Sequence, residues 1–169
     1  MVWWKKNVVT QTYSPSMDIQ VSSNFERQLF ESSGRDSETI NKIFHEFSKK
    51  NSYIFDKKIQ NDLKSSYSTT AVSNDETLYA IKQIKQKYNY LADPHTSTGL
   101  HALLEKDVDL PWVSLACAHP AKFGDAIEKA TGEPPVLPKD LSKLFDKEEK
   151  MTILDNNNEV LKSLILKNL

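Results

Sequence analysis

The sequence predicts an α/β fold that is rich in helix and has a few short strands. Apolar residues recur at helical spacing in several stretches of the chain. Three short β-prone or apolar runs lack this period, and helices are expected between them, an order typical of α/β proteins. Because three strands far apart along the chain make a poor parallel sheet, we expect an incomplete part of a larger fold.

The first elements are a strand and a capped helix. Val8 to Thr12 is rich in β-branched residues and is predicted as a strand, followed by turn-prone residues. Ser23 and Glu26 have the spacing of a capping box, in which each side chain bonds the other residue's amide. The sequence therefore predicts a helix from about residue 24 to 33, ending at Gly34.

Two further helical patterns follow in the first half. Asp36 or Ser37 can cap a helix with a 3.6-residue apolar period, which we expect to reach Lys50. The region from Asn51 to Ser66 has a weaker helical pattern. Its scattered apolar residues still favour a helix over a loop.

A short strand and a well-specified helix are predicted next. Ser68 to Val72 is β-prone. Ser73 and Glu76 form a second capping-box pattern that should open a helix. The apolar residues expected on one face of this helix are Leu78, Ile81, Ile84 and Tyr88.

A buried strand is predicted after the next short helix. Pro94 disfavours helical geometry at Asp93, and Thr96 is expected to cap the helix that follows. Trp112 to Ala118 is an apolar run without helical period, so we interpret it as a strand buried on both faces. A helix should begin at Pro120 and end at Gly132.

The chain closes with an irregular proline-rich connection and one more capped helix, from about Asn158 to Lys167. The apolar residues of that helix are expected to face inward: Val160, Leu161, Leu164 and Ile165. The run from Val160 to Leu166 is far shorter than a membrane span. We therefore expect no membrane insertion.

Composition excludes several classes of function. The formal net charge of -1 gives no field to gather nucleic acid or an anionic membrane. The single cysteine, Cys117, excludes internal disulfides and fits a reducing cytoplasm, and the start of the chain lacks the features of a secretory signal. The four histidines show no metal-ligand spacing, and the four glycines form no phosphate-binding turn.

The junction from Ala116 to Lys122 is where the sequence predicts a ligand site, because a buried strand runs directly into a helix start. Ordinary strand-to-helix packing is the alternative. Cys117 is interpreted as a buried structural thiol rather than a nucleophile, since a nucleophilic cysteine needs a base within hydrogen-bond reach or an electropositive setting. His95 is interpreted as ordering a turn, because its motif shows no obvious acid or base partner. Asn24 is expected to bond the helix start rather than a ligand.

Three runs carry a resemblance to the carboxy-terminal part of threonine synthase. They are YSPSMDIQVSSNFER at 13–27, DPHT at 93–96 and AHPAKF at 118–123. The similarity extends from about Val8 to near the end of the chain, with residues 1–7 unmatched. It implies an incomplete, helix-rich part of the large domain of a fold type II pyridoxal-phosphate enzyme.

The resemblance also implies a reaction and a cofactor. Threonine synthases convert O-phosphohomoserine and water to threonine and phosphate on pyridoxal 5'-phosphate. At the position matching Cys117 they carry a hydroxyl residue beside the pyridine nitrogen, and a thiol is the weaker hydrogen-bond donor. Lys122 does not match the family's Schiff-base lysine, which lies with the phosphate loops upstream of the matched region.

These observations lead to three functional hypotheses. The first is an inactive carboxy-terminal remnant that does not bind the cofactor alone. The second is one half of a split threonine synthase, active only with a complementary amino-terminal chain. The third is a non-catalytic interaction module that uses exposed strand edges and apolar faces.

Overall fold

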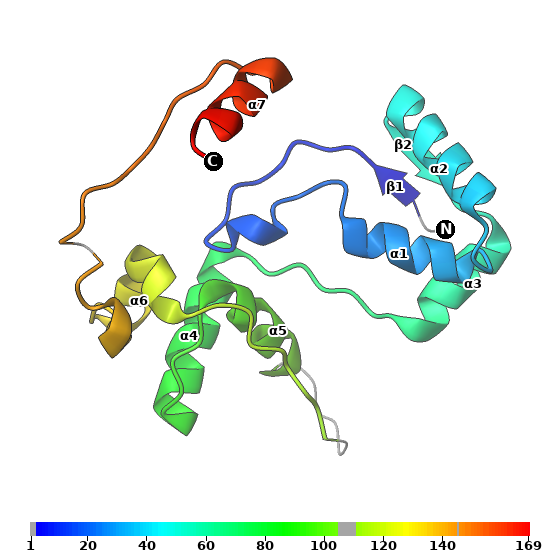
Figure 1. Ribbon diagram of the computed structural model, residues 1–169. Coiled ribbons are helices and arrows are strands. Elements are labelled where there is room, and N and C mark those ends of the chain that lie inside the picture. Colours follow the sequence, from blue (N-terminus) through cyan, green and yellow to red (C-terminus); the bar gives the residue numbers. More distant parts are fainter. Residues whose placement is uncertain (1–2, 105–110, 145) are drawn as a thin grey trace. The chain divides into compact units, whose positions relative to one another are not determined.

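The computed structural model describes residues 3–104, 111–144 and 146–169 (Figure 1). The chain divides into two compact units, Met1–Val136 and Leu137–Leu169. The first unit contains two hydrophobic clusters and the residues of the candidate site.

The first cluster is built from three helices and a small sheet. Helices α1 (Ser23–Ser32), α2 (Ser37–Lys50) and α3 (Lys57–Ser66) pack with strands β1 (Trp3–Lys5) and β2 (Ser52–Ile54). The two strands pair antiparallel. The buried residues of the cluster are Leu29, Ile40, Ile43, Phe55, Ile59 and Leu63.

Trp4, from β1, packs against this cluster. Its ring stacks on Phe47 with a centroid separation of 3.7 Å and an interplanar angle of 9°. It also meets Phe44 edge-on at 5.1 Å, and its indole nitrogen donates a hydrogen bond to the carbonyl of Gln20 at 3.3 Å. An indole that satisfies its one donor while burying a large apolar surface is a strong tertiary contact. Strand β1 is thus part of the packing of this unit.

The second cluster brings together helices from the later part of the chain. Helix α4 (Asn74–Tyr88) packs against both α5 (Pro94–Leu104) and α6 (Gly124–Thr131). Ile81 of α4 and Ile127 of α6 are fully buried in this cluster. A left-handed Gly132, with φ of 81°, ends α6 as the sequence predicts.

Helix caps explain where these helices begin. Ser73 and Glu76 form the predicted capping box at the start of α4. Asp36, one of the two expected residues, caps α2 by accepting from the amides of Glu38 and Thr39. The capping box expected at Ser23 was wrong, because the cap position of α1 is Ser22, whose side chain makes no capping bond.

The strand positions differ from those expected. None of Val8–Thr12, Ser68–Val72 and Trp112–Ala118 forms a strand in the described chain. A strand needs a neighbour to satisfy its backbone groups, and β-prone composition alone does not supply one. Val113 and Leu115 are 84% and 79% exposed, so the expected buried strand is instead an extended, solvent-facing segment. The broader prediction, a helix-rich fold with short strands, is confirmed.

The second unit contains a 3-10 turn, η3 (Lys139–Leu141), and helix α7 (Asn158–Lys167), capped by Asn157. The bounds of α7 agree with the sequence prediction. Its apolar stripe is not buried, since Leu161 and Ile165 are about half exposed.

In the first unit, Tyr88 on α4 is also exposed, although it was expected on the apolar face of that helix. A search of the described helices finds none that is long and apolar enough to cross a membrane.

Replacing Ser73 by alanine is expected to lower the free energy of unfolding by about 1 kcal/mol, because the amide of Glu76 loses its acceptor. Urea denaturation would measure the change. Ser22→Ala is the matched control, because Ser22 also occupies a cap position but makes no capping bond. Equal losses in both variants would contradict the assignment.

Replacing Trp4 by alanine is expected to lower the free energy of unfolding by about 3 kcal/mol through the loss of its packing on Phe47. Tyr79→Ala, at an aromatic residue that is 55% exposed, should change it by less than about 0.5 kcal/mol. Chemical denaturation of both variants checks this. A Trp4 variant as stable as the control would show that β1 does not contribute to the packing.

Candidate functional site

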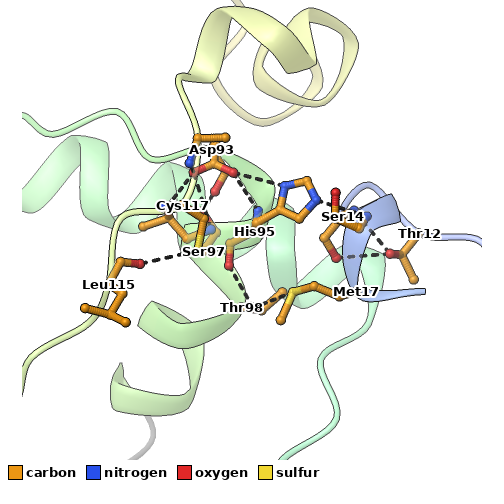
Figure 2. Close-up of polar contacts among 12 residues, drawn as sticks. Thr12, Ser14, Met17, Asp93, His95, Ser97, Thr98, Leu115 and Cys117 are labelled. Atoms are coloured by element: carbon orange, nitrogen blue, oxygen red, sulfur yellow. Dashed lines mark hydrogen bonds and ion pairs between the residues drawn. The ribbon is translucent and has the colours of Figure 1, made fainter. Parts of the chain in front are cut away.

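A buried carboxylate, that of Asp93, lies at the start of α5 and is 1% exposed. One of its oxygens accepts from the amide and ring Nδ1 of His95, at 2.9 and 3.1 Å. The other accepts from the Thr96 hydroxyl and from the amide of Ala118 at 3.2 Å. These donors come from two separate segments of the chain, and Figure 2 shows Asp93 close to His95 and Cys117.

The hydrogen bonds decide the ionisation of Asp93. Burial raises the pKa of the Asp93 carboxyl, but bonds from the Thr96 hydroxyl, the amides of His95 and Ala118 and the His95 ring outweigh it. The pKa is therefore held below the ordinary value of 3.8. Asp93 also caps α5, a role that the sequence analysis wrongly gave to Thr96.

His95 connects Asp93 to a distant loop. Its Nε2 accepts a hydrogen bond from the amide of Ser16 at 3.2 Å, so the hydrogen-bond pattern places the ring proton on Nδ1, facing Asp93. The ring also packs against Phe123, with centroids 4.8 Å apart. The interpretation that His95 orders a turn agrees with this geometry. The expectation that its motif holds no acid partner was wrong, since Asp93 precedes it by two residues.

The loop at 12–18 is ordered by its own polar contacts. The Thr12 amide and hydroxyl both donate to the carboxylate of Asp18, at 2.7 and 2.8 Å. The Tyr13 amide donates to the side chain of Asn74 at the start of α4. Ser14 is buried in this loop. The loop is therefore held by its own polar contacts and by α4, in addition to its contact with His95.

Cys117 is held by its backbone and presents its side chain to solvent. Its amide donates to the Thr96 hydroxyl oxygen at 2.9 Å. The thiol is exposed, with Sγ 3.6 Å from the carbonyl of Leu115. The expectation of a buried structural thiol was wrong, because the backbone amide faces the buried cluster. His119 caps the turn η2 (Pro120–Phe123), accepting from the Ala121 amide at 3.2 Å.

The described residues meet few of the requirements of a pyridoxal-phosphate site. A Schiff-base lysine needs an amine whose pKa is lowered by burial or a nearby cation. Lys129 shows the reverse, because its bond to the Tyr13 hydroxyl raises its pKa. Lys122 is exposed, with Nζ 5.9 Å from the ring centroid of Phe123. The exposed thiol of Cys117 can offer one contact, so these residues do not fit a complete cofactor site. Among the described residues, no group of three His, Cys, Asp or Glu could hold a metal.

Two hollows lie near residues that the sequence analysis singled out. One, of about 620 Å³, lies beside α1 and α3 and is lined in part by Asn24, Phe25 and Tyr67. A smaller one, of about 360 Å³, is lined in part by Thr12 and Lys122. Neither is lined by Asp93 or Cys117, so neither belongs to the buried cluster.

Comparison with known proteins finds threonine synthases among the relatives of this chain. A family model described as threonine synthase, C-terminal, matches residues 96–165. Threonine synthase of Pseudomonas aeruginosa is 36% identical over 156 residues, covering 90% of this chain and 33% of the relative. That of Saccharomyces cerevisiae is 34% identical, covering 95% of this chain and 36% of the relative. The chain thus spans about a third of the length of these relatives.

Solved structures give the same result. A crystal structure of PLP-bound threonine synthase from Brucella melitensis matches with a TM-score of 0.85 and 36% identity, covering 96% of this chain and 35% of that chain. Yeast threonine synthase matches with a TM-score of 0.83 and 30% identity, covering 99% of this chain and 39% of that chain. These likenesses confirm the predicted fold class, part of a fold type II pyridoxal-phosphate architecture.

Replacing Asp93 by asparagine is expected to lower the free energy of unfolding by about 3 kcal/mol at neutral pH, because buried donors lose a charged acceptor. Since the folded pKa of Asp93 lies below 3.8, its contribution is present above that value and is lost as the pH falls through the folded pKa. The gap between wild type and Asp93→Asn should therefore narrow below about pH 4.

Urea denaturation between pH 7 and pH 3 measures this gap. Asp75→Asn, at an exposed residue, is the control and should change stability by no more than about 0.5 kcal/mol. A gap that stays constant over the whole range would show that ionised Asp93 does not stabilise the fold.

Proposed function

We propose, since the chain belongs to the threonine synthase family, that it contributes the Cys117 side of a threonine synthase site and makes no threonine by itself. The observation that carries the proposal is the setting of Lys122 and Lys129, which are both exposed to solvent. The bond from Lys129 to the Tyr13 hydroxyl raises the pKa of Lys129 rather than lowering it. Neither meets the requirement for a Schiff-base lysine.

The family resemblance gives the chemistry that a complete site would perform. Pyridoxal phosphate, when bound, supplies the electron sink for the conversion of O-phosphohomoserine and water to threonine and phosphate. This chain would contribute the orientation of Cys117, at the position where the family carries a hydroxyl beside the pyridine nitrogen. Its thiol is the weaker donor there.

Completion by a second polypeptide is the alternative that a structural observation favours. The segment at 111–117 is extended, and its Val113 and Leu115 side chains are largely exposed. An extended segment of this kind offers backbone donors and acceptors to an added strand. An amino-terminal threonine synthase chain that supplies the lysine and the phosphate loops would be the partner. A non-catalytic interaction module would use the same segment without producing any activity.

The purified chain, mixed with pyridoxal phosphate and O-phosphohomoserine, is expected to show no stoichiometric absorbance of bound cofactor and no release of inorganic phosphate. The Pseudomonas aeruginosa threonine synthase serves as the positive control. Phosphate release by this chain alone, at a rate within about 100-fold of the control, would overturn the proposal.

Co-expression with an amino-terminal threonine synthase segment tests the alternative. Cofactor absorbance and phosphate release that appear in the complex but in neither chain alone would establish a split enzyme. A stable complex with neither property would favour the interaction module instead.

A further inference from the structure

We propose that Thr96 and Asp93 act as positioning residues for Cys117, and that the same carboxylate couples this position to the loop carrying Ser16. The inference rests on the proposed function in that Cys117 is taken as the cofactor-facing residue. The hydrogen bonds involved all lie within this chain, so the positioning role can be tested without the cofactor.

The Thr96 hydroxyl has a fixed direction. A hydroxyl has one proton, and Thr96 donates it to the carboxylate of Asp93. The oxygen then has lone pairs free to accept from the amide of Cys117, at 2.9 Å. Because Asp93 is kept ionised, it can only accept, so the proton of Thr96 is directed away from Cys117. The ionised acid thereby orients the acceptor that holds the cysteine amide.

Two consecutive backbone amides are bonded to the buried cluster. The Cys117 amide is bonded to Thr96, and the next amide, of Ala118, is bonded to Asp93 at 3.2 Å. Two such bonds on either side of one Cα restrict the φ and ψ angles of Cys117 and therefore the direction of its Cα–Cβ bond. Cys117 is exposed, while its backbone amide bonds to the buried Thr96.

A close approach of α5 provides a further point of attachment. A Cβ at Gly99 would lie 2.9 Å from the Oγ of Ser114, so the segment before Cys117 runs directly against this helix. The glycine permits this approach because it has no side chain. The segment is thus held against α5 at Ser114, Cys117 and Ala118, whereas Val113 and Leu115 are exposed.

Asp93 is also connected, through His95, to the loop at 12–18. The second oxygen of Asp93 accepts from His95, whose Nε2 accepts from the amide of Ser16. The bond to Asp93 fixes the tautomer that leaves Nε2 free to accept. One carboxylate therefore orders two segments that are about 100 residues apart in the chain. Loss of Asp93 should affect both segments, whereas loss of the Thr96 hydroxyl should affect one.

Amide hydrogen exchange on the full chain tests these steps. In the wild type, the amides of Cys117 and Ala118 should exchange at least 10-fold more slowly than those of Val113 and Leu115. In Thr96→Val, exchange at Cys117 should rise at least 10-fold while that of Ser16 stays unchanged, and Thr96→Ser should restore protection. In Asp93→Asn, both Cys117 and Ser16 should lose protection.

Thiol alkylation gives a second readout, because Cys117 is the sole cysteine and labelling is unambiguous. The rate of reaction with iodoacetamide should change at least threefold in Thr96→Val and return to the wild-type value in Thr96→Ser. Thr98→Val is the matched control, because Thr98 lies on the same helix and donates to the carbonyl of His95. It should leave the rate unchanged.

Three results would overturn the proposal. They are equal exchange at Cys117 and Val113 in the wild type, a Thr96→Val variant with wild-type protection at Cys117, and a uniform rise that includes the buried amide of Ile81. The wild-type comparison requires no variant to fold. None of these readouts depends on pyridoxal phosphate, so a chain that binds no cofactor can still support the positioning role. Conversely, an active chain could still lack it.

Discussion

The buried carboxylate of Asp93 is the group on which the arrangement of the site depends. An ionised acid that is almost completely removed from water is unfavourable unless its oxygens accept several hydrogen bonds. Here the donors come from the adjacent helix start and from the distant amide of Ala118. Satisfying the charge therefore requires the two segments to meet, and the same requirement determines the backbone at Cys117.

Apolar packing supports this polar cluster without forming it. The core around Ile81 and Ile127 holds α4 and α6 together, and α5, which begins within the DPHT motif, packs against α4. The loop at 12–18 reaches the same region through Tyr13, which bonds Asn74 on α4 and accepts from Lys129 on α6. Helix packing thus brings the segments near one another, and a small number of hydrogen bonds then sets their directions.

Helices were predicted well because their signals are local. The capping box at Ser73 and the apolar period of α4 are contained within one stretch of sequence. The strands were predicted poorly, because a strand must pair with a neighbour that can lie far along the chain. The apolar run at 112–118 has no paired strand among the described residues. For the site, DPHT and Cys117 were both singled out. The role of Asp93 was missed, although an aspartate three residues before Thr96 is itself a capping pattern.

The exposed segment that precedes Cys117 has a consequence for the behaviour of the chain at high concentration. Residues 112–118 carry no charge, are rich in apolar side chains and lie in an extended conformation. Such stretches stack readily into intermolecular cross-β assemblies. Pro111 and Pro120 flank it and cannot donate to a growing ladder, so they act as gatekeepers that confine the hazard to a short window.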